Sequence, residues 1–148
     1  MGKLQAGVGV ATITPPVGIE MGAWALRQGL AQGVHDDHYA RALVLDDGET
    51  LLAIVSLDVA CISKSFTDAI RDLVAAQTSI PRQNILLNCS HTHTTPYTWR
   101  QPAAGLSAGH SAYLTAFPHY VAGAIIEAWH HRAPVSYTHL TLPTIYSV

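Results

Sequence analysis

The chain has 148 residues, 49% of them hydrophobic, which suits one globular domain with a substantial core. Its formal net charge is −2 and its eight Lys and Arg residues are scattered, which argues against nucleic acid or an anionic membrane as a partner. No apolar run reaches the ~18 residues of a transmembrane segment, and no secretion signal opens the chain, so we expect a cytoplasmic protein with a small-molecule partner.

The first part of the chain predicts a strand, a long loop and a hairpin. In LQAGVGVATITP, the alternation that places Val8 and Val10 on one face indicates a strand, which two prolines end. Residues 17–37 show no clear period and predict a long loop, a kind of segment that often serves function. Apolar runs on both sides of DDGE, residues 46–49, indicate a β-hairpin whose second strand is central in the sheet.

The second part predicts two helices around a short strand. A helix is expected over residues 63–78, with Ser63 as its N-cap, followed by a buried strand in NILLNCS, residues 84–90. An amphipathic helix is expected over residues 111–131, and Pro118 should break or restart it. This order predicts an α/β fold, a mixed sheet with a β-hairpin and at least two flanking helices.

The end of the chain differs in composition from the rest. Within residues 135–148, the stretch VSYTHLTLPT resembles the in-frame translation of a common sequencing adapter. We therefore expect residues 1–134 to be native, residues 135–148 to be a non-native tail, and the protein to be a fragment of a longer parent. The alternative is a genuine Thr-rich tail.

The stretch NILLNCSHTHTTP joins a strand to a polar, histidine-bearing segment. Side chains two residues apart point to the same side of an extended chain, so His91 and His93 should converge beyond the carboxyl end of the strand, where α/β sheets bind ligands. Imidazole is a common zinc ligand, and a catalytic zinc ion usually has three protein ligands. The pair therefore predicts part of a zinc site. The alternative is two exposed loop histidines capped by neighbouring hydroxyl groups.

Four segments resemble, in order and spacing, the N-terminal domain of neutral/alkaline non-lysosomal ceramidases: GVGVATITPPVGIEMGAW, GVHDDHYARALVLDDG, AIVSLDVACIS and NILLNCSHTHTTP. The likeness covers Leu4 to about Pro134 and implies a fragment of a larger α/β/α zinc hydrolase domain. It also implies that His91 binds zinc and that His93 is a further ligand or a contact to the reacting group. Thr94 stands where the family has Ser and keeps the hydroxyl group. The remaining ligands implied, a His, a Glu and a Tyr, come from later in the family's chain.

Other polar residues are weaker candidates. His35 lies in GVHDDHY, a segment that lies close to the site in the family the chain resembles. Asp58 follows a buried run and is expected either in the site or as a partner for the N-terminus of the next helix. His38, His110 and His119 are expected at the surface.

The resemblance implies hydrolysis of an amide, which in ceramidases is the N-acyl bond of a sphingoid base, by water that Zn²⁺ activates. We predict His91 and His93 as metal ligands and His93, His35 and Asp58 as catalytic residues. The partner is a small-molecule amide or lipid, and the loops WALRQGLAQG and YTWRQPAAGL are candidates to line its groove. The alternative is a non-enzymatic α/β module whose His-Thr-His turn is structural or binds metal without catalysis.

Overall fold

The computed structural model describes residues 4–24, 26–27, 29–99 and 105–135. The expected α/β order, with a hairpin and two helices, is confirmed. In chain order the elements are β1 (Gln5–Thr12), β2 (Tyr39–Asp46), β3 (Leu51–Leu57), α1 (Lys64–Ala75), a 3-10 turn (Arg82–Asn84), β4 (Ile85–Cys89), α2 (Ala108–His130) and β5 (Ala133–Pro134).

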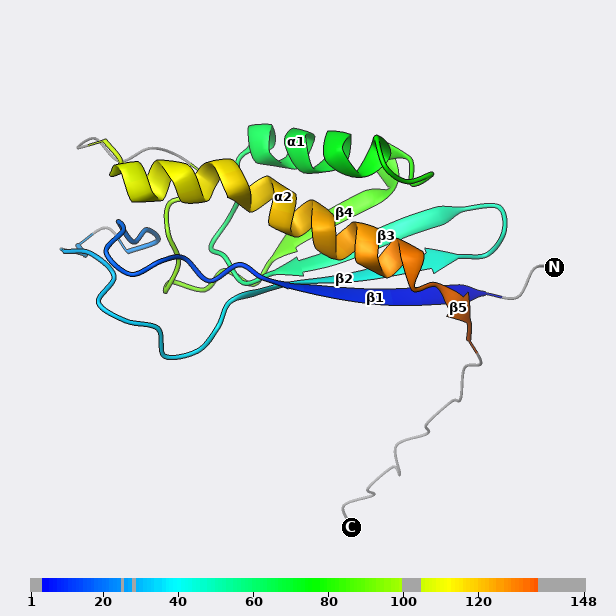
Figure 1. Ribbon diagram of the computed structural model, residues 1–148, viewed down its shortest axis with the longest axis horizontal. Coiled ribbons are helices and arrows are strands. Elements are labelled where there is room, and N and C mark those ends of the chain that lie inside the picture. Colours follow the sequence, from blue (N-terminus) through cyan, green and yellow to red (C-terminus); the bar gives the residue numbers. More distant parts are fainter. Residues whose placement is uncertain (1–3, 25, 28, 100–104, 136–148) are drawn as a thin grey trace, which may run out of the picture.

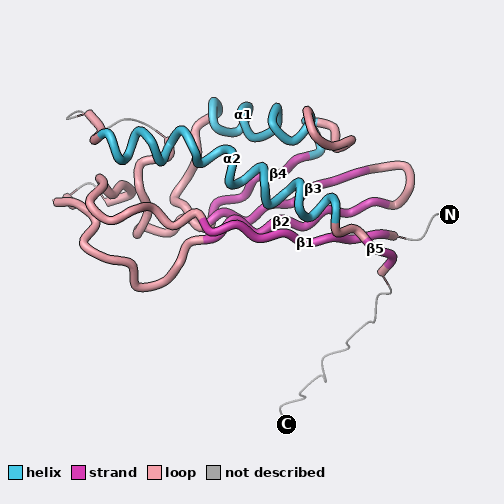
Figure 2. The backbone as a smooth tube through the Cα atoms, viewed as in Figure 1, coloured by secondary structure: helices cyan, strands magenta, loops and turns pink. Residues whose placement is uncertain are grey.

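The strands form one mixed sheet in the order β4-β3-β2-β1-β5. β3 and β4 are parallel, with α1 as the crossover between them, and the other neighbouring pairs are antiparallel. β3 lies between β2 and β4, as its two apolar faces predict. Both helices cover the same face of the sheet (Figure 1). The long loop between β1 and β2 and the loop between β4 and α2 gather at one end of the sheet (Figure 2).

Two local signals in the sequence are confirmed. The carboxylate of Asp47 accepts the amide hydrogen of Thr50 at 2.7 Å, and Gly48 takes the positive φ of 91° that the hairpin turn requires. Ser63 is the N-cap of α1 and accepts a hydrogen bond from the amide of Phe66.

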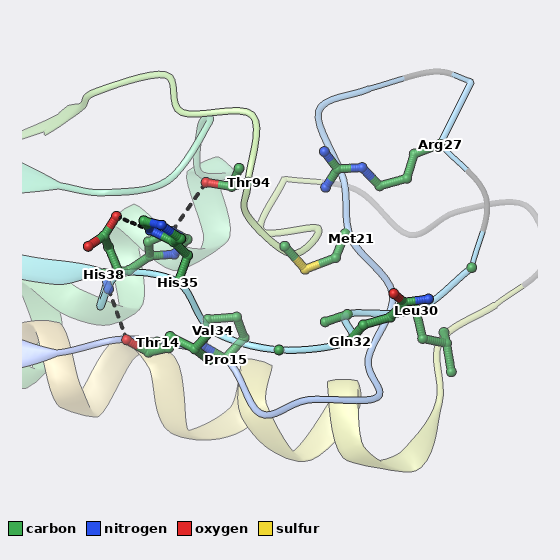
Figure 3. Close-up of a pocket in the computed structure, with 14 residues that line it drawn as sticks. Thr14, Pro15, Met21, Arg27, Leu30, Gln32, Val34, His35, His38 and Thr94 are labelled. Carbon is green, nitrogen blue, oxygen red and sulfur yellow. Dashed lines mark hydrogen bonds and ion pairs between the residues drawn. The ribbon is translucent and has the colours of Figure 1, made fainter.

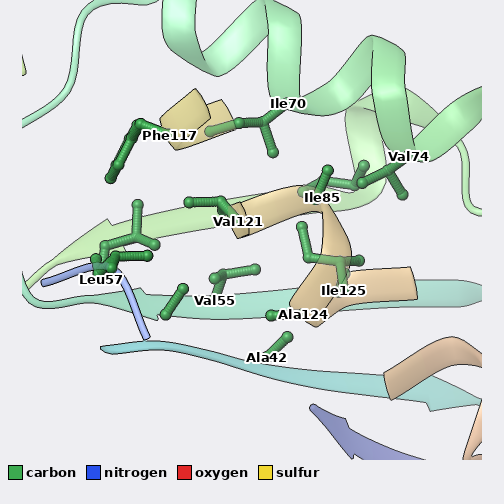
Figure 4. Packing of buried hydrophobic residues seen from close by; sticks show 14 of the residues in the cluster. Ala42, Val55, Leu57, Ile70, Val74, Ile85, Phe117, Val121, Ala124 and Ile125 are labelled. Carbon is green, nitrogen blue, oxygen red and sulfur yellow. The ribbon is translucent and has the colours of Figure 1, made fainter. Parts of the chain in front are cut away.

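The prediction that Pro118 breaks the second helix is wrong. α2 begins at Ala108, earlier than expected, and continues through Pro118 to its end. Phe117 and Val121, on either side of the proline, are fully buried, and this burial offsets the backbone hydrogen bond that proline cannot make. Figure 4 shows these side chains between the helices and the sheet, in a core that includes Ala42, Val55, Leu57, Ile70, Val74, Ile85, Ala124 and Ile125.

α2 lies directly on β1 because two glycines face it. A Cβ atom added at Gly9 would stand 2.1 Å from the carbonyl oxygen of Ala124, and one added at Gly7 would stand 2.0 Å from that of Ala128. No real side chain fits at such distances. The valines that alternate with these glycines therefore point to the other face of the sheet.

The face of the sheet without helices carries an apolar row. Val8, Leu43, Ile54 and Leu86 are partners in register across four neighbouring strands. Val8 is 66% exposed and Leu86 is 55% exposed. The described residues thus leave an apolar sheet face uncovered, which is unusual for a sheet with parallel strands.

Among the described residues, none of the helices combines the length and hydrophobicity needed to cross a bilayer. At the C-terminal side, β5 pairs with β1, and the amide of Val135 donates to the carbonyl oxygen of Leu4 at 2.9 Å. Residues 136–148 lie outside the described residues, so the non-native origin of residues 135–148 stays a prediction.

The glycine contact predicts opposite effects for two glycine substitutions. Gly9→Ala should lower the free energy of unfolding by about 3 kcal/mol, because its methyl group displaces the backbone of α2. Gly123→Ala, on the exposed side of the same helix with open space around it, should raise that free energy by about 1 kcal/mol. Urea denaturation of both variants measures the two values. Equal changes in the free energy of unfolding, or a Gly9→Ala variant as stable as the wild type, would contradict the close contact.

Candidate functional site

The His-Thr-His segment follows β4 and continues beside the end of β3. The amide of Ser90 donates to the carbonyl oxygen of Leu57 at 2.9 Å, and that of His91 donates to Val59 at 3.1 Å. The segment therefore lies at the carboxyl end of the two parallel strands, where the sequence predicts it and where α/β sheets bind ligands.

His91 has a special backbone conformation and a fixed ring. Its φ of 62° lies in the left-handed region, which costs energy for a residue other than glycine. Its Nδ1 atom lies 2.8 Å from the carbonyl oxygen of Ala60. A carbonyl oxygen only accepts, so Nδ1 must carry the hydrogen, and in the neutral ring Nε2 then keeps its lone pair. Metal-binding histidines are commonly oriented by such a bond from the other ring nitrogen.

His93 lies next to His91. The two ring centroids are 5.1 Å apart, with the ring planes at 73°, and both residues are exposed. The ring of Trp24, from the long loop, stands edge-on at 6.3 Å from that of His93. Within the described ranges, no group of three His, Cys, Asp or Glu residues could hold a metal ion. The described residues thus supply a pair of neighbouring nitrogen donors.

The side chain of Asp58 is hydrogen-bonded to the neighbouring strand β2. Its carboxylate accepts hydrogen bonds from the guanidinium of Arg41 at 2.9 Å and from the amide of Tyr39 at 3.0 Å. Asp58 is not the N-cap of α1, because Ser63 occupies that position. The contacts of Asp58 therefore join β2 to the end of β3, and its catalytic role stays a prediction.

The two histidines of GVHDDHY have different surroundings. The imidazole of His35 is 96% exposed and pairs with Asp36 at 2.6 Å. His38, expected at the surface, is half-buried and lines an open cavity. Its Nε2 atom lies 3.4 Å from the hydroxyl oxygen of Thr94, in the segment that follows His93. His38 comes directly before β2 and two residues before the buried Ala40, and this alternation accounts for its partial burial.

An open cavity of about 660 Å³ lies beside this segment. The long loop forms most of its wall, and Thr94 belongs to its lining. Figure 3 shows His35 and His38 at one end of the cavity and Arg27 at the other. Met21, Leu30 and Val34 supply apolar surface, so the cavity suits a ligand with both apolar and polar parts. Of the two loops expected to line a groove, residues 100–104 of the second lie outside the described residues.

His110, expected at the surface, is fully buried, so that prediction is also wrong. Its Nδ1 lies 3.0 Å from a carboxylate oxygen of Glu20, and its Nε2 lies 3.2 Å from the carbonyl oxygen of Tyr97. The amide and the hydroxyl group of Ser107, the N-cap of α2, both donate to the same carboxylate at 2.9 Å. The sequence signal was helical spacing, because His110 precedes the buried Phe117 by two turns.

These contacts change the pKa of Glu20. Burial alone raises the pKa of this carboxyl group, but hydrogen bonds from its surroundings, including Ser107 and His110, outweigh burial and lower the pKa below its ordinary 4.5. A carboxyl group with a lowered pKa stabilises the fold above its unfolded-state pKa. This contribution is lost as the pH falls through the folded-state pKa.

Glu20→Gln should therefore have a pH-dependent effect on stability. The free energy of unfolding of the variant should lie below that of the wild type near neutral pH, and the difference should shrink as the pH falls below 4.5. Urea denaturation over a range of pH measures this difference. Glu49→Gln, in the exposed hairpin turn, is the matched control. A Glu20→Gln deficit that stays constant down to acidic pH would contradict the account.

Comparisons with known proteins agree with this fold. The chain has a TM-score of 0.72 to neutral ceramidase from Pseudomonas aeruginosa and 0.70 to a ceramidase complexed with C2. Each is 23% identical in sequence, and each match covers 90% of this chain but 22% of the ceramidase. No curated protein sequence matches the chain. The family model described as "Neutral/alkaline non-lysosomal ceramidase, N-terminal" matches residues 4–141, so the chain belongs to the neutral/alkaline ceramidase family.

Proposed function

We propose that the chain is the N-terminal part of a zinc-dependent amide hydrolase in which Nε2 of His91 is a zinc ligand. The observation that carries this proposal is the hydrogen bond from Nδ1 of His91 to the carbonyl oxygen of Ala60. It fixes the ring and leaves Nε2 free to bind a metal. The left-handed backbone at His91 is a second support, because such strain is common at functional sites.

The donors of this chain suit zinc but are too few for a complete site. Zinc binds imidazole nitrogen well, and His93 lies close enough to His91 to share one site as a ligand or as a contact to the substrate. When bound, zinc lowers the pKa of water towards ~7 and polarises the scissile carbonyl group. The family resemblance implies that the remaining ligands, a His, a Glu and a Tyr, come from later in the parent chain, and this chain spans 22% of each ceramidase it matches.

The proposed substrate is an amide with an acyl chain. Family membership supports this class, and so does the cavity, where Met21, Leu30 and Val34 offer apolar surface and Thr94 and His38 offer polar groups. Trp24 lies beside His93 and is suited to covering an apolar part of the substrate. His35, at the rim of the same cavity, is placed to meet a polar part.

The uncovered sheet face supports a larger parent domain. Val8, Ile54 and Leu86 are exposed in the described residues although they belong to one apolar row in register across four neighbouring strands. A further layer of the parent, packed on this row, would bury the exposed side chains. Sheets with parallel strands are normally covered on both faces. The parent is thus expected to complete both the core and the zinc site.

A non-enzymatic module is the alternative, because the bond between His91 and Ala60 also closes a structural turn. Activity of the full-length parent separates the two. The parent should hydrolyse an N-acylsphingosine, and His91→Ala should lower its kcat/KM at least ~100-fold. Mutating a residue that only orients a zinc ligand can already lower activity by ~100-fold, and the loss of a ligand should cost at least as much. The zinc content of the variant should fall with its activity.

His119→Ala is the matched control, because His119 is exposed on α2, outside the described candidate site. It should keep both activity and zinc. The 148-residue chain, supplied with zinc, should show no amidase activity, since it lacks the remaining ligands. An active His91→Ala parent would contradict the ligand assignment, and zinc-dependent turnover by the 148-residue chain would contradict its incompleteness.

A further inference from the structure

We infer that His110 is a positioning residue, held as a doubly protonated imidazolium between Glu20 and Tyr97, and that it fixes the segment that follows His93. The importance of that segment for catalysis rests on the proposed function. The protonation state and the anchoring rest on contacts within this chain alone.

The geometry assigns both protons. The carboxylate of Glu20 and the backbone carbonyl of Tyr97 lie 3.0 Å and 3.2 Å from the two ring nitrogens of His110, and both groups act as acceptors. A neutral imidazole has one N–H, so it would turn a lone pair towards one of these oxygens. His110 is fully buried, so no water molecule can donate a hydrogen bond to that lone pair. The imidazolium satisfies both bonds.

The surroundings of His110 balance its charge. A cation in the first turn of a helix opposes the helix dipole, which alone disfavours an imidazolium at this point of α2. The carboxylate of Glu20 offsets this effect, since it also accepts the amide and hydroxyl hydrogens of Ser107 at the same helix end. The ring of Tyr97 stacks over the imidazole with centroids 6.4 Å apart. Arg27 and Tyr97 are the other titratable groups in the hollow that Glu20 lines.

This cluster anchors the segment beyond His93 to the rest of the fold. The amide of Gly22 donates to Thr95 at 2.7 Å, and the amide of Ser63 donates to the carbonyl oxygen of Thr98 at 3.1 Å. Tyr97 lies between these two acceptors and is held by His110. The imidazolium thus joins three parts of the chain, namely the long loop through Glu20, the segment after His93 through Tyr97, and α2.

The protonation state is measured by NMR on the 148-residue chain with ¹⁵N-labelled histidine, without metal or substrate. At pH about 7.5, an ordinary histidine is mostly neutral. Both ring nitrogens of His110 should nevertheless show the ¹⁵N shifts of protonated nitrogen in the folded chain. They should revert to the shifts of a neutral ring when the same sample is unfolded in urea. One unprotonated nitrogen in the folded wild type would overturn the inference.

Hydrogen exchange tests the positioning. In Glu20→Gln, His110 should lose its second proton, and the amides of Gly22 and Ser63 should exchange about tenfold faster or more. The amide of Ala76, at the end of α1, should keep its rate, as should all three amides in the control Glu49→Gln. Unchanged exchange of Gly22 and Ser63 would overturn the anchoring role. Neither experiment uses zinc or substrate, so a failure of the proposed hydrolase function leaves both results interpretable.

Discussion

The direct contact between the backbones of α2 and β1 is the constraint on which the rest of the structure depends. Gly7 and Gly9 leave no Cβ atoms on the face of β1 that meets the helix, so α2 settles against the strand itself. Glycine weakens a strand interior, and the close packing that it permits here compensates for that cost. With α2 fixed along its length, Phe117 and Val121 reach the core, and the start of the helix comes to the loop end of the sheet.

The position of the helix start connects the fold to the candidate site. His110, in the first turn of α2, meets Glu20 from the long loop and the backbone of Tyr97. Four residues before Tyr97, His93 lies against His91, whose ring is held from the other side by the carbonyl oxygen of Ala60. Buried contacts made by α2 and by the end of β3 therefore hold the exposed imidazoles in place. Such support is what a site needs if its groups are to hold their geometry.

Signals that act over a few residues could be read from the sequence, and effects of long-range packing could not. The hairpin, the Ser63 cap and the position of His91 at the end of a strand all follow from local patterns. The prediction for Pro118 is wrong because tertiary burial outweighs the missing hydrogen bond. The prediction for His110 is wrong because its partners are distant in the sequence, and Glu20 lies 90 residues earlier. The surroundings of Asp58 depend in the same way on which strand lies beside β3.

We expect the ring of His91, fixed through Nδ1, to present Nε2 to zinc in the parent protein. Crystals of the full-length parent, grown with zinc and measured at the zinc absorption edge, test it most directly. The expected result is an anomalous peak at the usual ~2.0–2.1 Å from Nε2 of His91, with Nδ1 still bonded to the carbonyl oxygen of Ala60. A zinc ion bound through Nδ1, or one that does not contact His91, would contradict it.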